Sequence, residues 1–380
     1  MKKAVLILTL ILLGNCLVPL CGYYAALAVR GRSLAAAASV LAADFAGAGP
    51  QAGGIAFPAY PARTAQPSGQ AHSAAPAASA APGASAAPAA SAPADAAAGL
   101  VLVQDASTGE VLQVPLREYL IGAVASEMPV SWPDAALQAQ AVAIHSYVLY
   151  CRANNDTAVL NGAWLSADPA QRQGFMTDAV LHSYWGTDYD ANYARLASLV
   201  DPVLSDVLTY DGAPAAASYF AISDGRTEAS ENVWDKALPY LISVDSSSDL
   251  AADNYACTVT YTSQQMYDAL VLNLGITPPA GCRPEQYFSD YTYTDAGYVA
   301  AVKVCGVSVR GIVLRSALHL RSACFSIDYA DNTFSIVTKG YGHGVGLSQW
   351  GAKAMAEAGS SWQDILQHYF PGTAVAAWAE

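Results

Sequence analysis

Apolar side chains recur every three or four residues between positions 116 and 127, which is the spacing of one face of an α-helix. The apolar residues on that face are Leu116, Tyr119, Leu120, Ala123 and Val124. Glu127 lies on the same face in the last turn, and Met128 and Pro129 follow it. Because the residue before a proline is disfavoured in the helical conformation, the helix should end there. The pattern predicts a buried helix with one carboxylate on its core-facing side.

A carboxylate on the buried side of a helix is costly unless it has a partner or a chemical task. Removal from water raises the pKa of a carboxyl group, and a carboxyl that keeps its proton can act as a general acid. The alternative is that Glu127 caps the helix or pairs locally. The pattern alone does not separate the two interpretations.

The rest of the body alternates between strand-like and helix-like periods. Apolar runs on both sides of Ser107-Thr108-Gly109 predict a β-hairpin. Ser131 and Asp134 resemble a capping box before a second, alanine-rich helix that runs to about Tyr150. Further helices are predicted at 182–199, 263–274, 312–322, 348–358 and 362–369. Further strands are predicted at 203–210, 218–223, 239–244, 298–304, 307–309 and 334–338. We expect an α+β fold, with mixed sheets and packed helices around a long cleft.

Composition divides the chain into three segments. Lys2 and Lys3 precede an uncharged run at 4–29, so residues 1–30 are predicted to be a single-pass signal anchor with the body outside the cytoplasm. A cleaved signal peptide is the alternative. Residues 31–99 are mostly Ala, Pro, Ser and Gly, which cannot form a core and predict a disordered linker. Residues 100–376 form the predicted body.

Charge indicates which partners to expect, and cysteine usage bears on the cellular compartment. The 380 residues carry a net charge of −13, with the acidic excess after residue 99. Such a body repels phosphate backbones, so nucleic acid is not an expected partner. The five cysteines of the body show no C-x-x-C pair. They are expected to be buried free thiols, although a Cys257–Cys282 bridge stays open for an exported body.

Two polar stretches follow apolar strands and are candidate sites. Residues 223–228 read SDGRTE, and residues 340–346 read GYGHGVG. No Lys-Ser/Thr follows the glycines, so this is not a Walker loop. Alternate glycines let a backbone approach another surface closely, and a plain tight turn is the alternative. The absence of H-E-x-x-H and G-x-S-x-G motifs disfavours common zinc peptidases and serine hydrolases.

Six blocks taken together resemble the family of stage II sporulation protein D and the amidase enhancers. The blocks are VPLREYLIGAVASEMP, ALQAQAVAIHSY, SDGRTEASENVW, LPYLISV, RGIVLRSALHLRS and GYGHGVGLSQWGAKAMAEAG. The resemblance implies a membrane-anchored lytic transglycosylase that cleaves peptide-free peptidoglycan strands during engulfment. It also implies a partner, the amidase and endopeptidase stage II sporulation protein P. A non-catalytic, glycan-binding amidase enhancer is the alternative.

The same resemblance suggests roles for individual residues. Glu127 matches the family's catalytic acid, whereas the family's following Lys and Arg read Gln138 and His145 here, which suggests weak or absent activity. The expected substrate-binding residues are Gln138, Gln140, His145, Ser223, Arg226, Thr227, Glu228, His343 and Gln349. Arg226 and Glu228 are alternatively an ordinary ion pair. Some relatives carry a structural zinc, but the matching positions here are Asn161, Ser166, Gln171 and Arg172. These are poor ligands, so no metal or other cofactor is expected.

Overall fold

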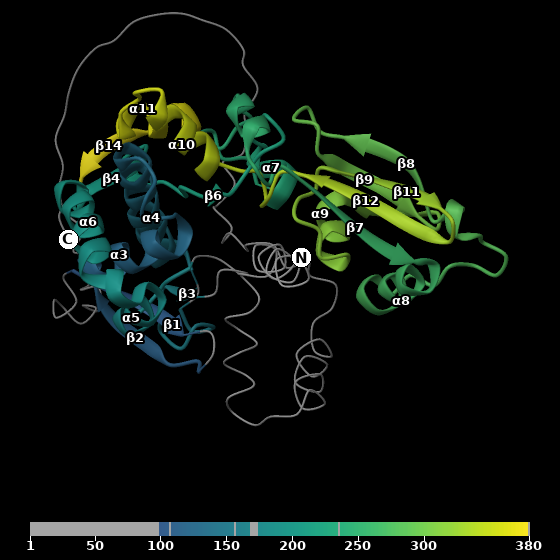
Figure 1. Ribbon diagram of the computed structural model, residues 1–380, viewed down its shortest axis with the longest axis horizontal. Coiled ribbons are helices and arrows are strands. Elements are labelled where there is room, and N and C mark those ends of the chain that lie inside the picture. Colours follow the sequence, from purple (N-terminus) through teal and green to yellow (C-terminus); the bar gives the residue numbers. More distant parts are fainter. Residues whose placement is uncertain (1–98, 106–107, 156, 168–173, 235, 379–380) are drawn as a thin grey trace, which may run out of the picture. The chain divides into compact units, whose positions relative to one another are not determined.

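The computed structural model describes residues 99–105, 108–155, 157–167, 174–234 and 236–378 (Figure 1). The predicted anchor, nearly all of the predicted linker, and Gln171 and Arg172 lie outside these residues. The described residues all belong to one compact unit, Gly53–Glu380. Among them, no helix combines the length and the apolar character needed to cross a membrane.

The described body is a mixture of helices and sheets, as expected for an α+β fold. The helices are α3 (Leu116–Glu127), α4 (Asp134–Asn154), α5 (Asp178–Trp185), α6 (Tyr189–Val200), α7 (Ser230–Trp234), α8 (Ser263–Leu274), α9 (Gly311–Ala317), α10 (Gln349–Glu357) and α11 (Trp362–Tyr369). Short 3₁₀ turns are η1 (Gly186–Asp188), η2 (Asp201–Val203), η3 (Ser247–Ala251) and η4 (Pro284–Gln286).

The described strands form small sheets of two or three strands each. They are β1 (Leu100–Asp105), β2 (Val111–Pro115), β3 (Leu165–Ala167), β4 (Asp206–Tyr210), β5 (Ala213–Pro214), β6 (Tyr219–Phe220), β7 (Ala256–Thr262), β8 (Phe288–Tyr293), β9 (Val299–Val304), β10 (Val307–Arg310), β11 (Phe325–Ala330), β12 (Thr333–Lys339), β13 (Leu347–Ser348) and β14 (Ala374–Ala377). The sheet orders are β2-β1-β3, β10-β9-β8, β11-β12-β7, β13-β6 and β14-β4-β5.

One hydrophobic core is built around α4. This helix packs against α3, α10, α11 and β4 (Figure 1), and most of its middle is buried. Ala139, Ala141 and Ala143 lie inside, where their short side chains let neighbouring elements approach closely. The prediction of a close-packed, alanine-rich helix is confirmed.

A second hydrophobic core lies within residues 256–339. The sheets β10-β9-β8 and β11-β12-β7 share it with α8 and α9, which lie beside the strands in Figure 1. Phe334 on the central strand β12 contacts the rings of Tyr287 and Phe288, each at 5.8 Å between centroids. Each core therefore has its own sheet and helix partners.

The alternate glycines at 340–346 run along the segment 218–222. The strand β13, which begins at Leu347, pairs in parallel with β6, and Tyr341 and Ile222 exchange backbone hydrogen bonds. A Cβ on Gly346 would overlap the carbonyl oxygen of Ser218, and one on Gly340 would lie 2.7 Å from that of Ile222. Both glycines have positive φ. The predicted close backbone approach is confirmed.

Several predicted elements agree with the structure. The hairpin β1–β2 pairs antiparallel, α8 and α11 have the predicted bounds, and the Ser348 side chain caps α10 by accepting from the Gly351 N–H. The strands β9, β10 and β12 lie within a residue or two of their predicted ranges. The sequence pattern does not predict β8 and β11, because exposed polar residues interrupt their apolar positions.

Other predictions are wrong. No side chain caps α4, because Asp134 instead accepts a hydrogen bond from Arg195 at 2.8 Å. The helix predicted at 182–199 is broken at 186–188, between α5 and α6. The helix predicted at 312–322 ends at Ala317, shortly before a residue with positive φ. Residues 239–244 form no strand, since the Thr227 side chain bonds the backbone of that segment.

The five cysteines of the described body are thiols rather than disulfides. Cys257 and Cys282 do not form the bridge that the sequence leaves open. Cys151 and Cys324 are buried as expected, whereas Cys257, Cys282 and Cys305 are partly exposed. Burial as thiols is therefore confirmed for two of the five.

Two histidines, the buried His145 and the half-buried His343, should make the protein less stable in acid. Burial lowers the pKa of His145 to about 4 and that of His343 to about 3. Since both folded pKa values lie below the ordinary value near 6.5, the unfolded chain binds these protons first. The free energy of unfolding should fall below about pH 6.5, with each histidine contributing about 1.4 kcal/mol per pH unit.

Urea denaturation between about pH 7 and about pH 4.5 measures this dependence. The raised pKa values of the buried Glu127 and Asp249 carboxyls act in the opposite direction, so the comparison needs a variant. His145→Gln should show a shallower slope than wild type. Equal slopes would contradict the assignment to His145.

Candidate active site

Glu127 is the last residue of α3, and its side chain is held by donors from two distant segments. The helix stops there because Met128 is extended, with its N–H still bonded to the Val124 carbonyl. One carboxylate oxygen of Glu127 accepts the Gly174 N–H at 2.8 Å, and the other accepts the Gln349 Nε2 at 3.2 Å. Two fixed donors leave the carboxylate little rotational freedom.

Burial raises the pKa of the Glu127 carboxyl above its ordinary value. The Gly174 and Gln349 hydrogen bonds favour the charged form and lower the pKa, as does the nearby Tyr219 hydroxyl. Burial outweighs them in this balance. A raised pKa suits a carboxyl that must first donate a proton and then take one back.

Glu127 lines an open cleft of about 980 Å³, part of which is solvent. The cleft residues beside it are Ser126 in α3 and, on the α3–α4 connection, Met128, Pro129, Val130 and Ser131. The other lining residues include Tyr184, Trp185, Asp188 and Asn192 from α5, η1 and α6. Glu127 therefore faces a space wide enough for a sugar unit rather than open water on a convex surface.

The segment 174–176 fixes the Glu127 end of α3. The Met176 N–H donates to the Gly122 carbonyl at 3.2 Å, and Phe175 stacks on Tyr119 with 5.0 Å between ring centroids. A Cβ on Gly122 would overlap the Met176 carbonyl oxygen, so this contact needs glycine in the helix. Sequence analysis does not identify Gly174, because its function comes from a backbone N–H.

Of the predicted substrate-binding residues, Gln349 is the one that contacts Glu127. Gln138 instead donates to the Leu199 carbonyl at 3.4 Å. Gln140 and His145 are buried within the α4 core and do not line the cleft. Gln138 and His145, at the two positions where the resemblance implies Lys and Arg, therefore lie outside the cleft.

Ser223 and Thr227 belong to buried hydrogen-bond networks. The Ser223 N–H donates to Asp249 Oδ2 at 2.7 Å, and Ser348 donates to the same oxygen at 2.7 Å. The Thr227 hydroxyl donates to a carbonyl and accepts an N–H of the segment 242–244. Arg226 is exposed, and its Nε donates to Ser243 Oγ at 3.3 Å, so the alternative of an ion pair with Glu228 is wrong.

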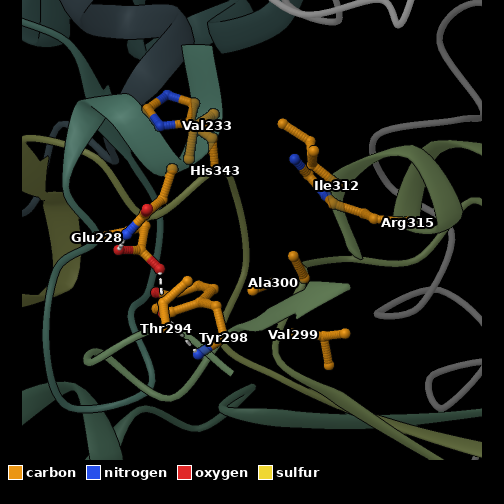
Figure 2. A pocket seen from close by; sticks show the side chains of 11 residues that line it. Glu228, Val233, Thr294, Tyr298, Val299, Ala300, Ile312, Arg315 and His343 are labelled. Atoms are coloured by element: carbon orange, nitrogen blue, oxygen red, sulfur yellow. Dashed lines mark hydrogen bonds between the residues drawn. The ribbon is translucent and has the colours of Figure 1, made fainter. Parts of the chain in front are cut away.

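Glu228 lies in a small pocket with Thr294, Asn232 and His343 (Figure 2). One carboxylate oxygen accepts the Ala229 N–H and Asn232 Nδ2, both at 2.8 Å, and the other accepts the Thr294 hydroxyl at 2.5 Å. The His343 ring accepts the Val345 N–H at its Nδ1. Through these contacts Glu228 links α7 to the connection between β8 and β9, so its role is structural.

A matched pair of variants tests this structural interpretation of Glu228. Glu228→Ala removes the acceptor of three donors and should lower the free energy of unfolding by about 2 kcal/mol. Glu228→Gln keeps one oxygen and should cost much less, because the Thr294 hydroxyl can reverse its role. Urea denaturation measures both. An unchanged stability of Glu228→Ala would return Glu228 to the candidates for substrate binding.

The described residues contain no group of three or more His, Cys, Asp and Glu side chains arranged to hold a metal ion. Of the four positions that the resemblance matches to zinc ligands, two are described. Asn161 donates to the Gly109 carbonyl at 3.2 Å, and Ser166 is buried in β3.

Comparison with known proteins agrees with this architecture. A sequence profile of the family described as Stage II sporulation protein matches residues 104–210. The chain is 36% identical over 273 residues to stage II sporulation protein D of Bacillus amyloliquefaciens, covering 72% of this chain and 77% of that protein. The corresponding protein of Bacillus subtilis is 34% identical over 265 residues, covering 70% and 75%.

A more distant relative is the amidase enhancer of Bacillus subtilis, which is 26% identical over 317 residues and covers 68% of this chain and 40% of that protein. These matches place the chain in a class of sporulation proteins. The chain belongs to the stage II sporulation protein D family.

Proposed function

We propose that this protein is a lytic transglycosylase that cleaves peptide-free peptidoglycan strands. The observation that carries the proposal is the Glu127 carboxyl, sheltered from water at the edge of a cleft and oriented by Gly174 and Gln349. The cleft supplies space for a polymer, and the raised pKa supplies a proton donor.

The reaction needs only one carboxyl group, which acts first as a general acid and then as a general base. Glu127 donates its proton to the glycosidic oxygen between muramic acid and glucosamine, and the C1–O bond breaks with oxocarbenium character. The C6 hydroxyl of the same muramic acid attacks C1, and Glu127 takes its proton. The products are a 1,6-anhydro-muramic acid end and a glucosamine 4-hydroxyl. No water is consumed, so a second catalytic carboxylate is not required.

Product analysis tests the proposal. The full-length protein is incubated with denuded glycan strands, and the fragments are examined by mass spectrometry. Anhydro-muramic acid ends support the proposal, whereas reducing ends would show that water had attacked. Binding without cleavage would favour a non-catalytic role.

A non-catalytic, glycan-binding amidase enhancer is the second candidate. Two observations favour it: the relative named amidase enhancer, and the replacement of the family's Lys and Arg by Gln138 and His145. Because Gln138 and His145 lie outside the cleft, their replacement leaves the surroundings of Glu127 intact. We therefore favour the enzyme.

We further propose that the body acts outside the cytoplasm, tethered by the N-terminal segment. The support is the uncharged run at 4–29 after Lys2 and Lys3, followed by the Ala/Pro/Ser-rich stretch. In this proposal the protein works beside stage II sporulation protein P, which would supply strands free of stem peptides.

Removal of the Gln349 donor should change the pH profile. This hydrogen bond lowers the pKa of Glu127, so Gln349→Leu should raise it. A general acid must be protonated, and activity is lost as pH rises through its pKa. The alkaline limb of the activity profile of Gln349→Leu should therefore move to higher pH. A limb that stays in place would show that Gln349 does not tune the acid.

A further inference from the structure

One wall of the cleft that holds Glu127 is built by a helix break. The helix α5 ends at Trp185, and the next residue, Gly186, has φ of 53° and donates its N–H to the His182 carbonyl. The turn η1 follows, and α6 begins at Tyr189. This break places Tyr184 and Trp185 from the end of α5 beside Asn192 from α6 among the cleft-lining residues.

Of the two aromatic residues in this wall, one is exposed and the other packs against the core. Tyr184 is 61% exposed, so its ring is accessible to a ligand in the cleft. Trp185 is half-buried against the α4 core, and the centroid of its ring lies 6.3 Å from that of Tyr184. A ring fixed from behind by packing loses little freedom when a ligand covers its front.

The charge of the cleft-lining residues favours an uncharged sugar over an anionic one. Glu127 and Asp188 are the charged residues among the described cleft-lining residues, and no Lys or Arg is among them. The Asp188 carboxylate disfavours an anionic ligand beside it, and the protonated Glu127 that the proposed reaction needs offers such a ligand no positive charge. In a peptidoglycan strand, muramic acid carries a lactyl carboxylate, whereas N-acetylglucosamine is uncharged.

We propose that Tyr184, Trp185 and Asn192 form a subsite for the uncharged N-acetylglucosamine ring on the leaving-group side of Glu127. The apolar C–H face of the pyranose would cover the two aromatic rings, and the Asn192 amide would bond a hydroxyl or the acetamido group. Asp188 keeps the lactyl carboxylate on the other side of the scissile bond. The placement of this subsite on the leaving-group side rests on the proposed function, whereas the stacking and hydrogen bonding of the sugar ring do not.

Calorimetric titration with chitotetraose, an uncharged N-acetylglucosamine oligomer, tests the subsite. The full-length Glu127→Gln protein is used as the background, so that binding is measured without cleavage. Trp185→Ala should raise Kd about tenfold and Tyr184→Ala about threefold. Tyr293→Ala is the matched control, because Tyr293 is also 61% exposed but lies on β8, and its Kd should be unchanged.

Trigalacturonate, an acidic oligosaccharide, tests the charge argument. It should bind measurably more weakly than chitotetraose, and Asp188→Asn should reduce the difference. Wild-type Kd values in both Tyr184→Ala and Trp185→Ala would overturn the subsite, as would equal affinity for the two oligosaccharides. If binding depends on the two aromatic rings but the wild-type protein forms no anhydro products, the subsite is supported and the proposed reaction is contradicted.

Discussion

Replacing Glu127 with glutamine is expected to lower the rate of anhydro-end formation by a factor of about 10² to 10⁴, the usual contribution of a general acid–base group. Glutamine has the same shape but cannot donate a proton to the glycosidic oxygen and recover it from the C6 hydroxyl. Its amide oxygen can still accept the Gly174 N–H, so the fold and the cleft should survive. The measurement is kcat on denuded strands.

Glu118→Gln is the control, because Glu118 lies on the same helix but is exposed in its first turn. Its rate should equal that of wild type. Retention of more than about a tenth of the activity in Glu127→Gln would be too much for loss of a general acid. It would contradict the proposed mechanism.

The helical elements of the body are predictable where their periods are undisturbed. In α3 the spacing predicts that Tyr119, Leu120, Ala123 and Val124 are buried, and all four are, with the half-buried Glu127 at the end of the helix. In α11 the side chain of the residue before the helix provides a capping box, and the apolar positions follow the helical period. Strands are harder to predict: the sequence pattern does not predict β7, whose ladder depends on β12, a partner far along the chain.

The substrate-binding residues show the limit of reasoning from residue type. Ser223, Thr227 and Glu228 look suited to sugar hydroxyls, yet each bonds protein groups instead. Which partner a polar side chain finds depends on tertiary packing, which a linear pattern does not contain. The cleft wall escapes sequence analysis for the same reason, since Trp185 reaches it only through the break at Gly186.

Gly174→Ala is expected to reduce kcat about a hundredfold while leaving the fold intact, because a displacement of about 1 Å at a catalytic group has that effect. A Cβ at this position would lie 2.5 Å from Ser126 Oγ and 3.0 Å from the Glu127 carboxylate. The backbone N–H that orients the acid would have to move away. The defect should appear in kcat rather than in Kd for chitotetraose, since the aromatic wall is untouched.

A double variant separates displacement of the acid from general damage. Ser126→Ala removes the closest obstructing atom, so Ser126→Ala/Gly174→Ala should recover part of the activity that Gly174→Ala loses. Ser126→Ala alone should be close to wild type, because its hydroxyl bonds the Ala123 carbonyl within the same helix. If the double variant is no faster than Gly174→Ala, crowding at Ser126 is not the cause. If Gly174→Ala is itself fully active, the Gly174 N–H does not position Glu127, and the carboxyl must be oriented by Gln349 alone.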